Sequence, residues 1–566
     1  MKQWKFIAVL CLFLAAGAAI IGRLVFLQVI NQGSYRAFAQ GQQNAAGMQK
    51  GERGTIYATD RDGNWYALAA NREIAYAFAS PSEIQNKEET AKAVSAVLGL
   101  EESAVFKKLQ NEESLYEVLK KEVAQEEAKQ IKELGIKGIY AGSKSARFYP
   151  QDSMASQVIG FVNQEGEGQY GVEEYYNDIL KGKEGMVKNS RNPASFLLFG
   201  SRSQAKDGSD IVLTIDYNIQ ATAETLLANS KESLGFEEGT IIVMEPLTGK
   251  ILALANNPSF NPNSYALAKD PAVFQNSATQ KIFEPGSIFK PVTMAAAIDT
   301  GSVTPDTAYT DNGILKVGGY TVSNYDQRTW GERTMKQVLE FSINTGVAFA
   351  ESQMGHQNFL RYIERFGFFE PTRIDLPGEA YSLNKAFRQG YEINFTTASF
   401  GQGIEMTLMQ IARAFAAILN GGVMPDVSIA ESAVDSQGAI TTLHKTSAPQ
   451  RSVISQKTAS QITDMLVGVV EEGYGKKAKM KGYYTAGKTG TAQVSFSSLG
   501  TQKAGYSDKT IQSFIGYAPA FNPRFLILVK LNNPKTKTAE YSAIPIFAKL
   551  QKYIIDYYQI PPDYEP

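Results

Sequence analysis

Cysteine and histidine are both scarce in this sequence, and their scarcity removes several classes of chemistry. The 566 residues include one cysteine, Cys11, so no internal disulfide can form, and no Cys/His cluster has the spacing of metal ligands. The two histidines, His356 and His444, lie in no recognisable motif, which argues against a Ser-His-Asp catalytic triad. We therefore expect neither a metal site nor a cofactor.

Excess charge and internal repeats are also missing. The formal net charge is −1, which gives no electrostatic basis for binding nucleic acid. No repeat with a period of roughly 20–50 residues is visible. With 43% hydrophobic and 20% charged residues, the composition is that of a folded protein with room for several domains.

One long apolar run is present, at the N-terminus. Phe6 to Gly22 carries no charged residue, and it would form about 25 Å of helix, slightly less than the roughly 30 Å of a bilayer core. The missing length is supplied if Arg23 snorkels and Leu24–Val29 continues the helix. The sequence therefore predicts a transmembrane anchor over residues 6–30.

The charges beside this run predict its orientation. Lys2 and Lys5 precede it, so residues 1–5 should form a short cytoplasmic tail, with the rest of the chain outside a bacterial cell membrane. A cleaved signal peptide is the alternative, because Ala15–Ala19 is rich in small residues. The uncleaved, single-pass anchor is favoured because the apolar run continues past these alanines without a polar break.

The sequence after the predicted anchor divides into two regions that differ in their patterns of apolar and charged residues. Residues 31–206 mix short strand-like runs with charged helical stretches and show no obvious chemistry. The apolar spacing there predicts helices over Glu88–Leu98, Glu101–Leu109 and Ser114–Leu134.

Residues 207–566 read as a sheet covered by helices, an α/β or α+β domain. Strands are expected at IVLTID, at GTIIVMEPLTGKILAL around a Pro/Gly turn, and at TAGKTGTAQV, SFIGYAPA and RFLILVKLN. Helices are expected over residues 289–300, 335–352, 404–420 and 545–558.

The stretch EPGSIFKP contains a hydroxyl and an amine that a helix would place together. Pro285 and Gly286 form a turn, and a helix that begins after them puts Ser287 and Lys290 on one face, one turn apart. An isolated Ser-x-x-Lys is most simply a helix cap followed by a solvated lysine. The rest of the sequence decides between the two interpretations.

Two further fragments follow in the same half of the chain, SINTG and AGKTGTAQV. Either fragment alone is unremarkable. In order, however, they complete the triple Ser-x-x-Lys, Ser-x-Asn and Lys-Thr-Gly that is typical of penicillin-binding proteins and class A β-lactamases. The residues concerned are Ser287, Lys290, Ser342, Asn344, Lys488, Thr489, Gly490 and Thr491.

Acyl transfer requires a nucleophile, a base and an oxyanion hole. Ser287 is the candidate nucleophile, and Lys290 can act as its base only when neutral. Lowering a lysine pKa from about 10.4 to near 7 requires about 4–5 kcal/mol, which burial and a second cation can supply, and Lys488 is the candidate cation. The backbone N–H groups of Ser287 and Thr491 would form the oxyanion hole.

The remaining motif residues suit the leaving group and the substrate. Ser342 can pass a proton to the leaving amine, and the Asn344 amide can bind the substrate backbone. The hydroxyls of Thr489 and Thr491 suit a carboxylate. Gly490 would let the strand approach the substrate closely.

The chain resembles the class B penicillin-binding proteins over nearly its whole length. The departures are small, since SIN replaces the more frequent Ser-Ser-Asn or Ser-Asp-Asn, and Ala58-Thr59 precedes Asp60. The stretches that carry the resemblance besides the three motifs are RLVFLQV (23–29), RGTIYATDRDG (53–63), RFYPQDSMASQVIGFVNQEGEGQYGVEEYYNDILKG (147–182), LTIDYNIQ (213–220) and SFGQG (399–403).

The resemblance implies a fold and a reaction. It implies an elongated α+β pedestal over 31–206 and, over 207–566, the transpeptidase fold shared with serine β-lactamases. Ser287 would attack the bond between the two terminal D-alanines of a peptidoglycan stem peptide, and an amine of a neighbouring stem would resolve the acyl-enzyme into a cross-link. β-Lactams, which mimic D-Ala-D-Ala, would trap Ser287, and D,D-carboxypeptidase activity is a possible side reaction.

Partners and alternatives follow from the same resemblance. A SEDS-type glycosyltransferase and other divisome or elongasome membrane proteins are the expected partners, with the stretch GFVNQEGEGQYGVE favouring the septal type. A β-lactamase and a non-catalytic β-lactam sensor or scaffold are the rival interpretations. The pedestal argues against a β-lactamase. The short cytoplasmic tail expected over residues 1–5 leaves no signalling region for a sensor, and the complete motif set argues against a silent scaffold.

Overall fold

The computed structural model describes residues 14, 17, 18, 20 and 21, and then 51–112, 114–183, 206–325, 327–444, 451–496, 500, 503 and 505–565. The predicted anchor over 6–30 therefore lies almost wholly outside the described residues. Within them, no helix combines the length and apolarity that crossing a bilayer would require.

The chain forms two compact units, each assembled from separated segments. Unit 1 contains residues 1–53, 71–148 and 181–208, and unit 2 contains residues 54–70, 149–180 and 209–566. The sequence predicts one boundary after residue 206, whereas the chain enters unit 2 three times. Much of the stretch over 147–182 thus packs with unit 2.

Unit 1 is a small α+β body around the second half of strand β2 (Trp65–Ala79), with which β3 and β4 both pair. Its helices pack over a core that includes Val94, Leu98 and Leu119. The Asn86 side chain accepts a hydrogen bond from the Glu89 N–H and so begins the first helix. The other elements are α3 (Lys87–Leu98), α4 (Glu102–Leu109), β3 (Glu117–Val123), α5 (Gln125–Glu133) and β4 (Ile139–Phe148).

The helix expected over 114–134 is wrong in its first half. Residues Glu117–Val123 form a strand, and only Gln125–Glu133 is helical. Leu119 and Val123 are buried because this segment pairs with β2, where Phe78 lies opposite Val118. Pairing with a distant strand overrides the helical periodicity of this segment, and the sequence of the segment alone does not reveal that pairing.

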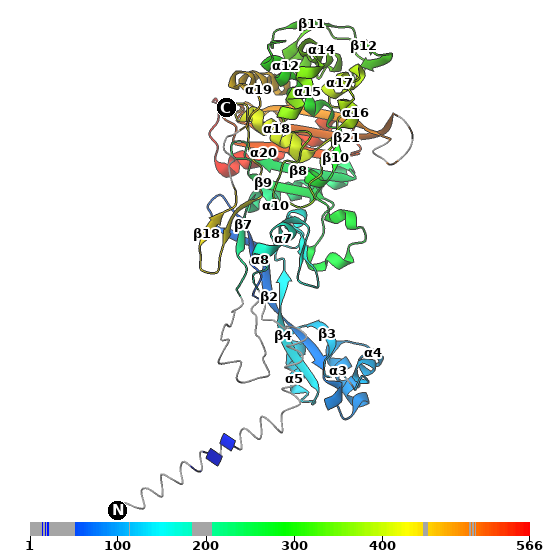
Figure 1. Ribbon diagram of the computed structural model, residues 1–566, viewed down its shortest axis with the longest axis vertical. Helices are drawn as coiled ribbons and strands as arrows, with labels where there is room; N and C mark the ends of the chain where they lie inside the picture. The colour runs from blue at the N-terminus through cyan, green and yellow to red at the C-terminus, as the bar shows by residue number, and fades with distance from the viewer. Residues whose placement is uncertain are drawn as a thin grey trace, which may run out of the picture. The chain divides into compact units, whose positions relative to one another are not determined.

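Unit 2 is built on a five-stranded antiparallel sheet in the order β20-β21-β22-β8-β9, visible at the centre of Figure 1. Every neighbouring pair in this order is antiparallel, and β20, which carries the Lys-Thr-Gly motif, is an edge strand. The strands are β8 (Glu238–Met244), β9 (Ile251–Asn257), β20 (Ala486–Ser495), β21 (Tyr506–Ala518) and β22 (Phe525–Asn532).

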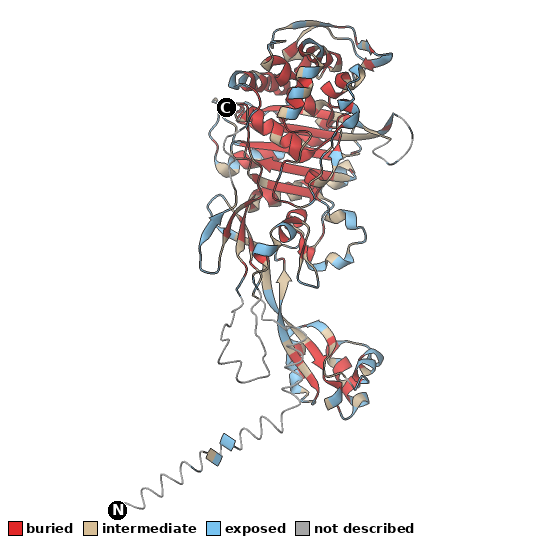
Figure 2. Cartoon of the chain, in the orientation of Figure 1, coloured by how far each residue is buried: buried red, intermediate tan, exposed pale blue. Residues whose placement is uncertain are grey.

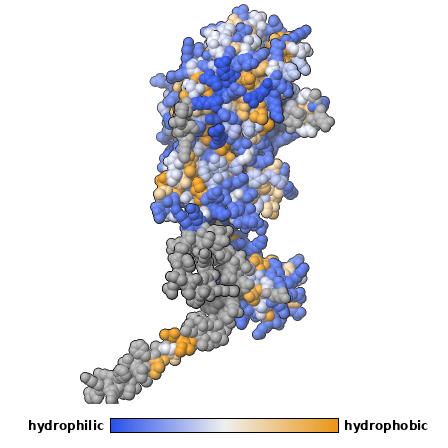
Figure 3. Space-filling view, in the orientation of Figure 1, coloured by the Kyte–Doolittle hydropathy of each residue, from blue (hydrophilic) through white to orange (hydrophobic). Residues whose placement is uncertain are grey.

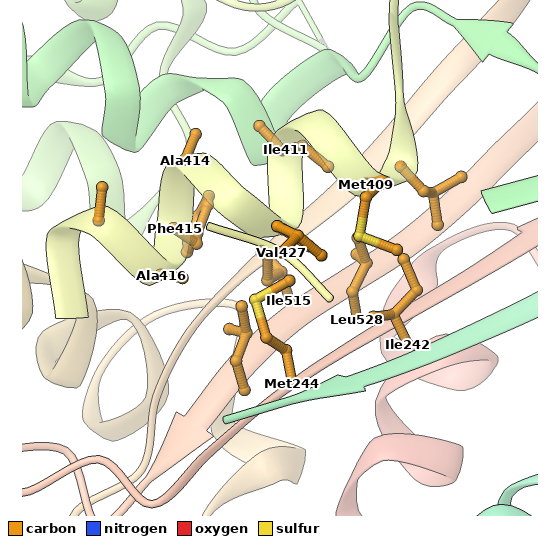
Figure 4. Close-up of a cluster of buried hydrophobic side chains, with 14 of the residues drawn as sticks. Ile242, Met244, Met409, Ile411, Ala414, Phe415, Ala416, Val427, Ile515 and Leu528 are labelled. Carbon is orange, nitrogen blue, oxygen red and sulfur yellow. The ribbon is translucent and has the colours of Figure 1, made fainter. Parts of the chain in front are cut away.

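Alternating apolar residues bury both faces of this sheet (Figure 2). On one face, Ile241 and Val529 pack under α10 (Tyr217–Leu234) and α20 (Ala543–Tyr558). On the other face, Ile242, Met244 and Leu528 contact Met409 and Phe415 of α18 (Leu408–Leu419), as Figure 4 shows. Fully burying each such side chain stabilises the fold by about 1.5–3 kcal/mol.

A helical layer over the α18 face holds the remaining motifs. Hydrophilic side chains cover most of the visible outer face of this unit (Figure 3). The helices are α11 (Ser277–Gln280), α12 (Lys290–Asp299), α13 (Met335–Glu340), α14 (Asn344–Met354), α15 (His356–Arg365), α16 (Lys385–Arg388), α17 (Glu392–Ser399), α18 (Leu408–Leu419) and α19 (Gln456–Glu471). Small two-stranded sheets lie among them, and of these only β12 with β13 is a hairpin of consecutive strands. The pairs are β10 (Ile282–Phe283) with β15 (Met406–Thr407), β11 (Ala308–Asp311) with β14 (Gly331–Thr334), β12 (Ile314–Val317) with β13 (Tyr320–Ser323), and β16 (Val423–Met424) with β19 (Arg451–Ser452).

A second sheet in unit 2 joins segments that are far apart in sequence. Strand β1 lies parallel to β7, and β17 pairs antiparallel with both β7 and β18. The adjoining turns need glycine: at Gly160, with φ of +80°, an added Cβ would lie 2.0 Å from the Tyr170 carbonyl oxygen. The strands of this sheet in unit 2 are β1 (Ile56–Thr59), β7 (Asp210–Asp216), β17 (Ala430–Val434) and β18 (Ile440–Thr442). The separate pair β5 (Phe161–Val162) and β6 (Gly168–Gln169) lies in the segment that also forms α6 (Ser156–Ile159), α7 (Gly171–Tyr175) and α8 (Asn177–Leu180).

Candidate active site

Ser287 lies in a single tight turn just before a buried helix. The turn is the 3₁₀ segment Gly286–Phe289, and α12 begins at Lys290. Ile288 and Phe289 are fully buried, whereas Ser287 is half-buried and lines a cavity. The predicted helix start after Gly286 is therefore confirmed, and the first turn of the helical segment is a 3₁₀ turn.

The backbone at Gly286 fixes this turn against the loop SFGQG. Gly286 has φ of +58°, and its N–H donates a hydrogen bond to the Gly401 carbonyl oxygen over 3.0 Å. At Gly401, with φ of +80°, an added Cβ would lie 2.2 Å from the Gly286 oxygen. The loop over 399–403 thus has a structural role, because it lets two backbones touch directly behind Ser287.

Gly401→Ala is expected to destabilise the fold and to slow acylation of Ser287. Backbone strain at such a position amounts to about 1–3 kcal/mol, and the clash with Gly286 adds displacement of the turn. The matched control is Gly301→Ala, because Gly301 has a similar φ of +74° but open space around its missing Cβ. Thermal unfolding of the two variants should show a clearly larger fall for Gly401→Ala, and equal falls would contradict the role of this contact.

Lys290 is fully buried, and its side-chain nitrogen is held by the Ser-x-Asn motif. Its Nζ donates to the Ser342 carbonyl oxygen at 2.5 Å, to Ser342 Oγ at 3.1 Å and to Asn344 Oδ1 at 2.7 Å. Burial, reinforced by the charge of Lys488, holds the pKa of Lys290 well below its usual range. The structure thus places the Lys290 amine within hydrogen-bonding distance of both Ser342 and Asn344.

Ser342 occupies a strained turn between two helices. The helix expected over 335–352 is broken here, since α13 ends at Glu340 and α14 begins at Asn344. Ser342 has φ of +53°, the left-handed region that non-glycine residues rarely adopt. This conformation turns both its hydroxyl and its carbonyl oxygen toward Lys290, which explains why the motif sits at a helix junction.

Asn344 lines the cavity and also holds Lys290 in place. Its Oδ1 accepts from Lys290, and its Nδ2 donates to the Ser323 carbonyl oxygen of β13 over 3.0 Å. The amide thereby links the buried lysine to the β12–β13 hairpin. Its second N–H remains the group that can reach a substrate backbone.

A buried carboxylate behind Asn344, which the motifs did not indicate, organises this corner. Asp311 accepts hydrogen bonds from the backbone N–H groups of Gly313 and Trp330 and from Asn324 Nδ2, at 2.7–3.0 Å. The hydroxyls of Tyr309 and Thr345 lie 2.8 and 2.7 Å from the same carboxylate. Burial raises the pKa of Asp311, but these hydrogen bonds outweigh it and leave the pKa below its ordinary value.

The Lys-Thr-Gly motif lies on edge strand β20, beside the Ser287 turn. Lys488 is fully buried, and its Nζ donates to the carbonyl oxygen of Thr489 at 3.2 Å. Thr489 and Thr491 line the cavity. At Gly490, an added Cβ would lie 2.4 Å from Ser513 Oγ and 3.0 Å from an Ile288 methyl group, so glycine is required for packing within the fold rather than only for the approach of substrate.

The charge of Lys488 influences the protonation of Lys290. Burial lowers the pKa of Lys488 to about 7, so its ammonium form dominates below that pH and repels a proton on Lys290. Replacing Lys488 removes this repulsion, raises the pKa of Lys290 and lowers its neutral fraction at the pH values where Lys488 is charged. A lysine can act as a general base only in its neutral form.

Lys488→Met is therefore expected to slow acylation and to move the acid limb of its pH profile to higher pH. The measurement is the second-order rate of penicillin acylation between about pH 5 and pH 9. Lys509→Met, on the exposed part of the adjacent strand, is the control. Weaker binding with an unshifted profile would leave Lys488 a carboxylate-binding role and remove the electrostatic one.

A cavity of about 640 Å³ joins these groups. It is lined by all three motifs, the β12–β13 hairpin and the segment 538–540. Neither histidine is among the described residues that line it; His356 Nδ1 instead contacts Glu351 Oε1 at 2.7 Å elsewhere in unit 2. The motif residues on its wall are Ser287, Ser342, Asn344, Thr489 and Thr491.

Two protein-family profiles match the chain. The profile of the penicillin-binding protein transpeptidase domain matches residues 239–552, and that of the penicillin-binding protein dimerisation domain matches residues 48–213. The chain is 32% identical over 530 residues to "Stage V sporulation protein D" of Bacillus subtilis, covering 91% of this chain and 81% of that protein.

Two further relatives extend the similarity over almost the whole chain. "Probable peptidoglycan D,D-transpeptidase PbpC" of Pseudomonas aeruginosa is 30% identical over 579 residues, covering 99% of this chain and 96% of that protein. The crystal structure of penicillin-binding protein 3 of Mycobacterium tuberculosis complexed with aztreonam superposes with a TM-score of 0.71 at 25% identity, covering 91% of this chain and 98% of that one.

The chain thus belongs to the penicillin-binding proteins, and the pairing of dimerisation and transpeptidase domains places it among their class B members. It is a serine-type peptidoglycan D,D-transpeptidase and a target of β-lactams.

Proposed function

We propose that Ser287 forms the acyl-enzyme of this transpeptidase and that Lys290 is its base. The observation that carries the proposal is the environment of Lys290, a fully buried lysine with a depressed pKa whose Nζ contacts Ser342 and Asn344. Neutral Lys290 takes the Ser287 proton as Ser287 Oγ attacks the carbonyl between the terminal D-alanines. Ser342 then delivers a proton to the departing D-alanine nitrogen.

The cavity wall supplies the groups that bind the substrate. Thr489 and Thr491, with Lys488 beneath them, suit the terminal carboxylate of the stem peptide. The N–H groups of Ser287 and Thr491 stabilise the oxyanion. The test is mass spectrometry of the penicillin-treated protein: the adduct is expected on the peptide that contains Ser287, and an adduct on any other serine would refute the assignment.

We propose further that the protein is a single-pass membrane protein with a cytoplasmic N-terminus and an outer catalytic domain. Support comes from Lys2 and Lys5 before the apolar run Phe6–Gly22. A reporter that is active only in the cytoplasm, fused to the C-terminus, should be inactive. Removal of residues 1–30 should give a soluble protein that still binds penicillin.

We also propose a role in septal wall synthesis and a protein partner for this enzyme. The stretch GFVNQEGEGQYGVE supports a role in septal wall synthesis, and one relative, "Peptidoglycan D,D-transpeptidase FtsI" from Buchnera aphidicola, is 27% identical over 582 residues. Recruitment of a fluorescent fusion to midcell is expected, and uniform labelling of the side wall would contradict it. Because cross-linking needs newly polymerised glycan, we propose a SEDS-type glycosyltransferase as partner.

We propose that this partner contacts the anchor and the 31–206 region of the chain. Ala15, Ala19 and Gly22 fall on one face of an anchor helix, where small residues permit close helix packing in lipid. Replacing all three with leucine keeps the apolarity, so insertion and penicillin labelling should survive while co-purification with the polymerase is lost. Full co-purification of the triple variant would exclude this face.

A further inference from the structure

Thr491 carries a hydroxyl that a backbone group orients from behind. The Ala539 N–H donates a hydrogen bond to Thr491 Oγ1 at 3.3 Å, and the part of the chain that the structure describes offers this hydroxyl no other hydrogen-bond partner. A hydroxyl that accepts a hydrogen bond on one side keeps its single proton for another acceptor. Because Thr491 lines the active-site cavity, that proton is available to a carboxylate of the substrate.

Ala539 belongs to the connection between β22 and α20. Residues 536–542, which we call the 536–542 segment, contain one 3₁₀ turn, Ala539–Tyr541, and residues 538–540 form part of the cavity wall. A single 3₁₀ turn has few hydrogen bonds of its own. The position of the Ala539 N–H therefore depends on the contacts that hold this segment to the rest of unit 2.

Gln512 ties both ends of the 536–542 segment to the central sheet. Its Nε2 donates to the Thr536 carbonyl oxygen at 2.5 Å, and its Oε1 accepts from the hydroxyls of Thr536 and Ser542 at 2.9 and 2.5 Å. The side chain is fully buried, and a carbonyl oxygen can only accept, so the orientation of the amide is fixed. Ala539 lies midway between the two tied ends.

The register of the sheet places this glutamine beside the Lys-Thr-Gly strand. Gln512 of β21 lies directly opposite Thr491 of β20, and residues that lie opposite each other point to the same face of a sheet. Gln512 is not among the described residues that line the cavity, so it acts on the substrate through the segment that it holds. Thr489 has a separate anchor, because its Oγ1 accepts from Lys488 Nζ at 3.4 Å.

We propose that Gln512 is a positioning residue for carboxylate recognition, because it holds the 536–542 segment in the place from which Ala539 directs the Thr491 hydroxyl at the end of the donor stem. The substrate class is a peptide whose last residue keeps a free α-carboxylate. Gln512 determines how strongly such a donor is preferred to a neutral analogue. The inference rests on the proposed function, in which Ser287 is acylated and Thr491 faces that carboxylate.

The test compares two donors on the full-length protein in detergent. Both are thioesters of an N-acyl-D-alanine, one with mercaptoacetate, which ends in a carboxylate, and one with mercaptoacetamide, which ends in a neutral amide. They form the same acyl-enzyme, so the ratio of their kcat/KM values for thiol release isolates the carboxylate. The wild type should prefer the acid. Gln512→Met, apolar and of similar size, should lower the acid-to-amide ratio about threefold or more.

A double-mutant cycle shows whether Gln512 acts through Thr491. Thr491→Val removes the hydroxyl and should lower the acid-to-amide ratio about tenfold or more, as expected for a hydrogen bond to a charged group. In that background, Gln512→Met should not change the ratio further, because the group that it positions is gone. A further fall of similar size would mean that Gln512 acts by another route and would overturn the proposal.

Two more variants separate positioning from a general loss of stability. Ser542→Ala removes one hydrogen bond to Gln512 with little change of shape, so it should lower the ratio in the same direction, and it carries the test if Gln512→Met does not fold. Gln220→Met is the matched control and should leave the ratio unchanged. Gln220 is equally buried and hydrogen-bonded, but it holds edge strand β9 at the opposite end of the sheet.

The remaining outcomes are also decisive. The assignment is overturned by a wild type that uses the amide as readily as the acid, by a folded Gln512→Met protein with the wild-type ratio, or by an equal fall in Gln220→Met. Labelling with fluorescent penicillin separates this inference from the proposed function. Failure of the proposed function would remove the Ser287 label from the wild type, whereas failure of this inference would leave the wild type labelled.

Discussion

Ser287→Ala should carry no covalent penicillin label, and cross-linking of stem peptides by the purified protein should fall to background. The substitution removes only the hydroxyl that becomes acylated, because the turn Gly286–Phe289 and the buried neighbours Ile288 and Phe289 stay in place. Fluorescence of the labelled protein on a gel measures the first effect, and dimer formation from a pentapeptide substrate measures the second.

The stability of the folded state should change little in this variant. Ser287 is half-buried, and the loss of such a hydroxyl usually alters the free energy of unfolding by less than about 1 kcal/mol. Ser233→Ala, at an exposed position of α10, is the matched control and should label as the wild type does. A Ser287→Ala protein that unfolds normally and still retains the label would place the nucleophile elsewhere.

Lys290→Met should reduce the rate of acylation about a hundred- to ten-thousandfold, the usual contribution of a general base. Methionine fills the space of the lysine stem and removes the amine, and none of the described residues on the cavity wall is a histidine that could replace it. The rate is measured by stopped-flow mixing with a fluorescent penicillin. Acylation at near wild-type rates would mean that another group accepts the Ser287 proton.

The same variant should be more stable than the wild type at neutral pH. Because the pKa of Lys290 is depressed in the folded state, the unfolded chain binds the extra proton. Stability contributed by this group therefore rises with pH from its folded pKa up to the ordinary lysine value, and is reduced below that range. Lys290→Met removes the dependence, so its advantage in urea unfolding should shrink as the pH approaches about 10.

The parts of the fold that could be predicted from sequence are those with a strong local pattern. Helices α12, α18 and α20 and the strands of the five-stranded sheet lie where the apolar periodicity placed them. The break at Ser342 could not be predicted in this way, because its left-handed conformation is held by the contact with Lys290, 52 residues away in sequence.

The candidate site likewise contains residues that local sequence motifs indicate and residues that only contacts between distant segments reveal. The eight motif residues were found from their spacing, and the structure brings them to one cavity or directly beneath its wall. Asp311 and Asn324 belong to none of the three motifs, so the spacing of the motifs does not indicate them. Only the tertiary fold shows that they hold the helix that begins at Asn344.

The several hydrogen bonds that the Asp311 carboxylate accepts have a consequence for the evolution of antibiotic resistance in this protein. A substitution that loosens Asp311 would disturb Asn344 and hence Lys290, and would slow acylation by the drug and by the stem peptide alike. A cell that escaped β-lactams by this route would also cross-link its wall poorly, so selection should disfavour it. Tyr320 and Tyr325, which are 63% and 64% exposed on the cavity rim, are freer to vary, and resistant lineages should accumulate changes there first.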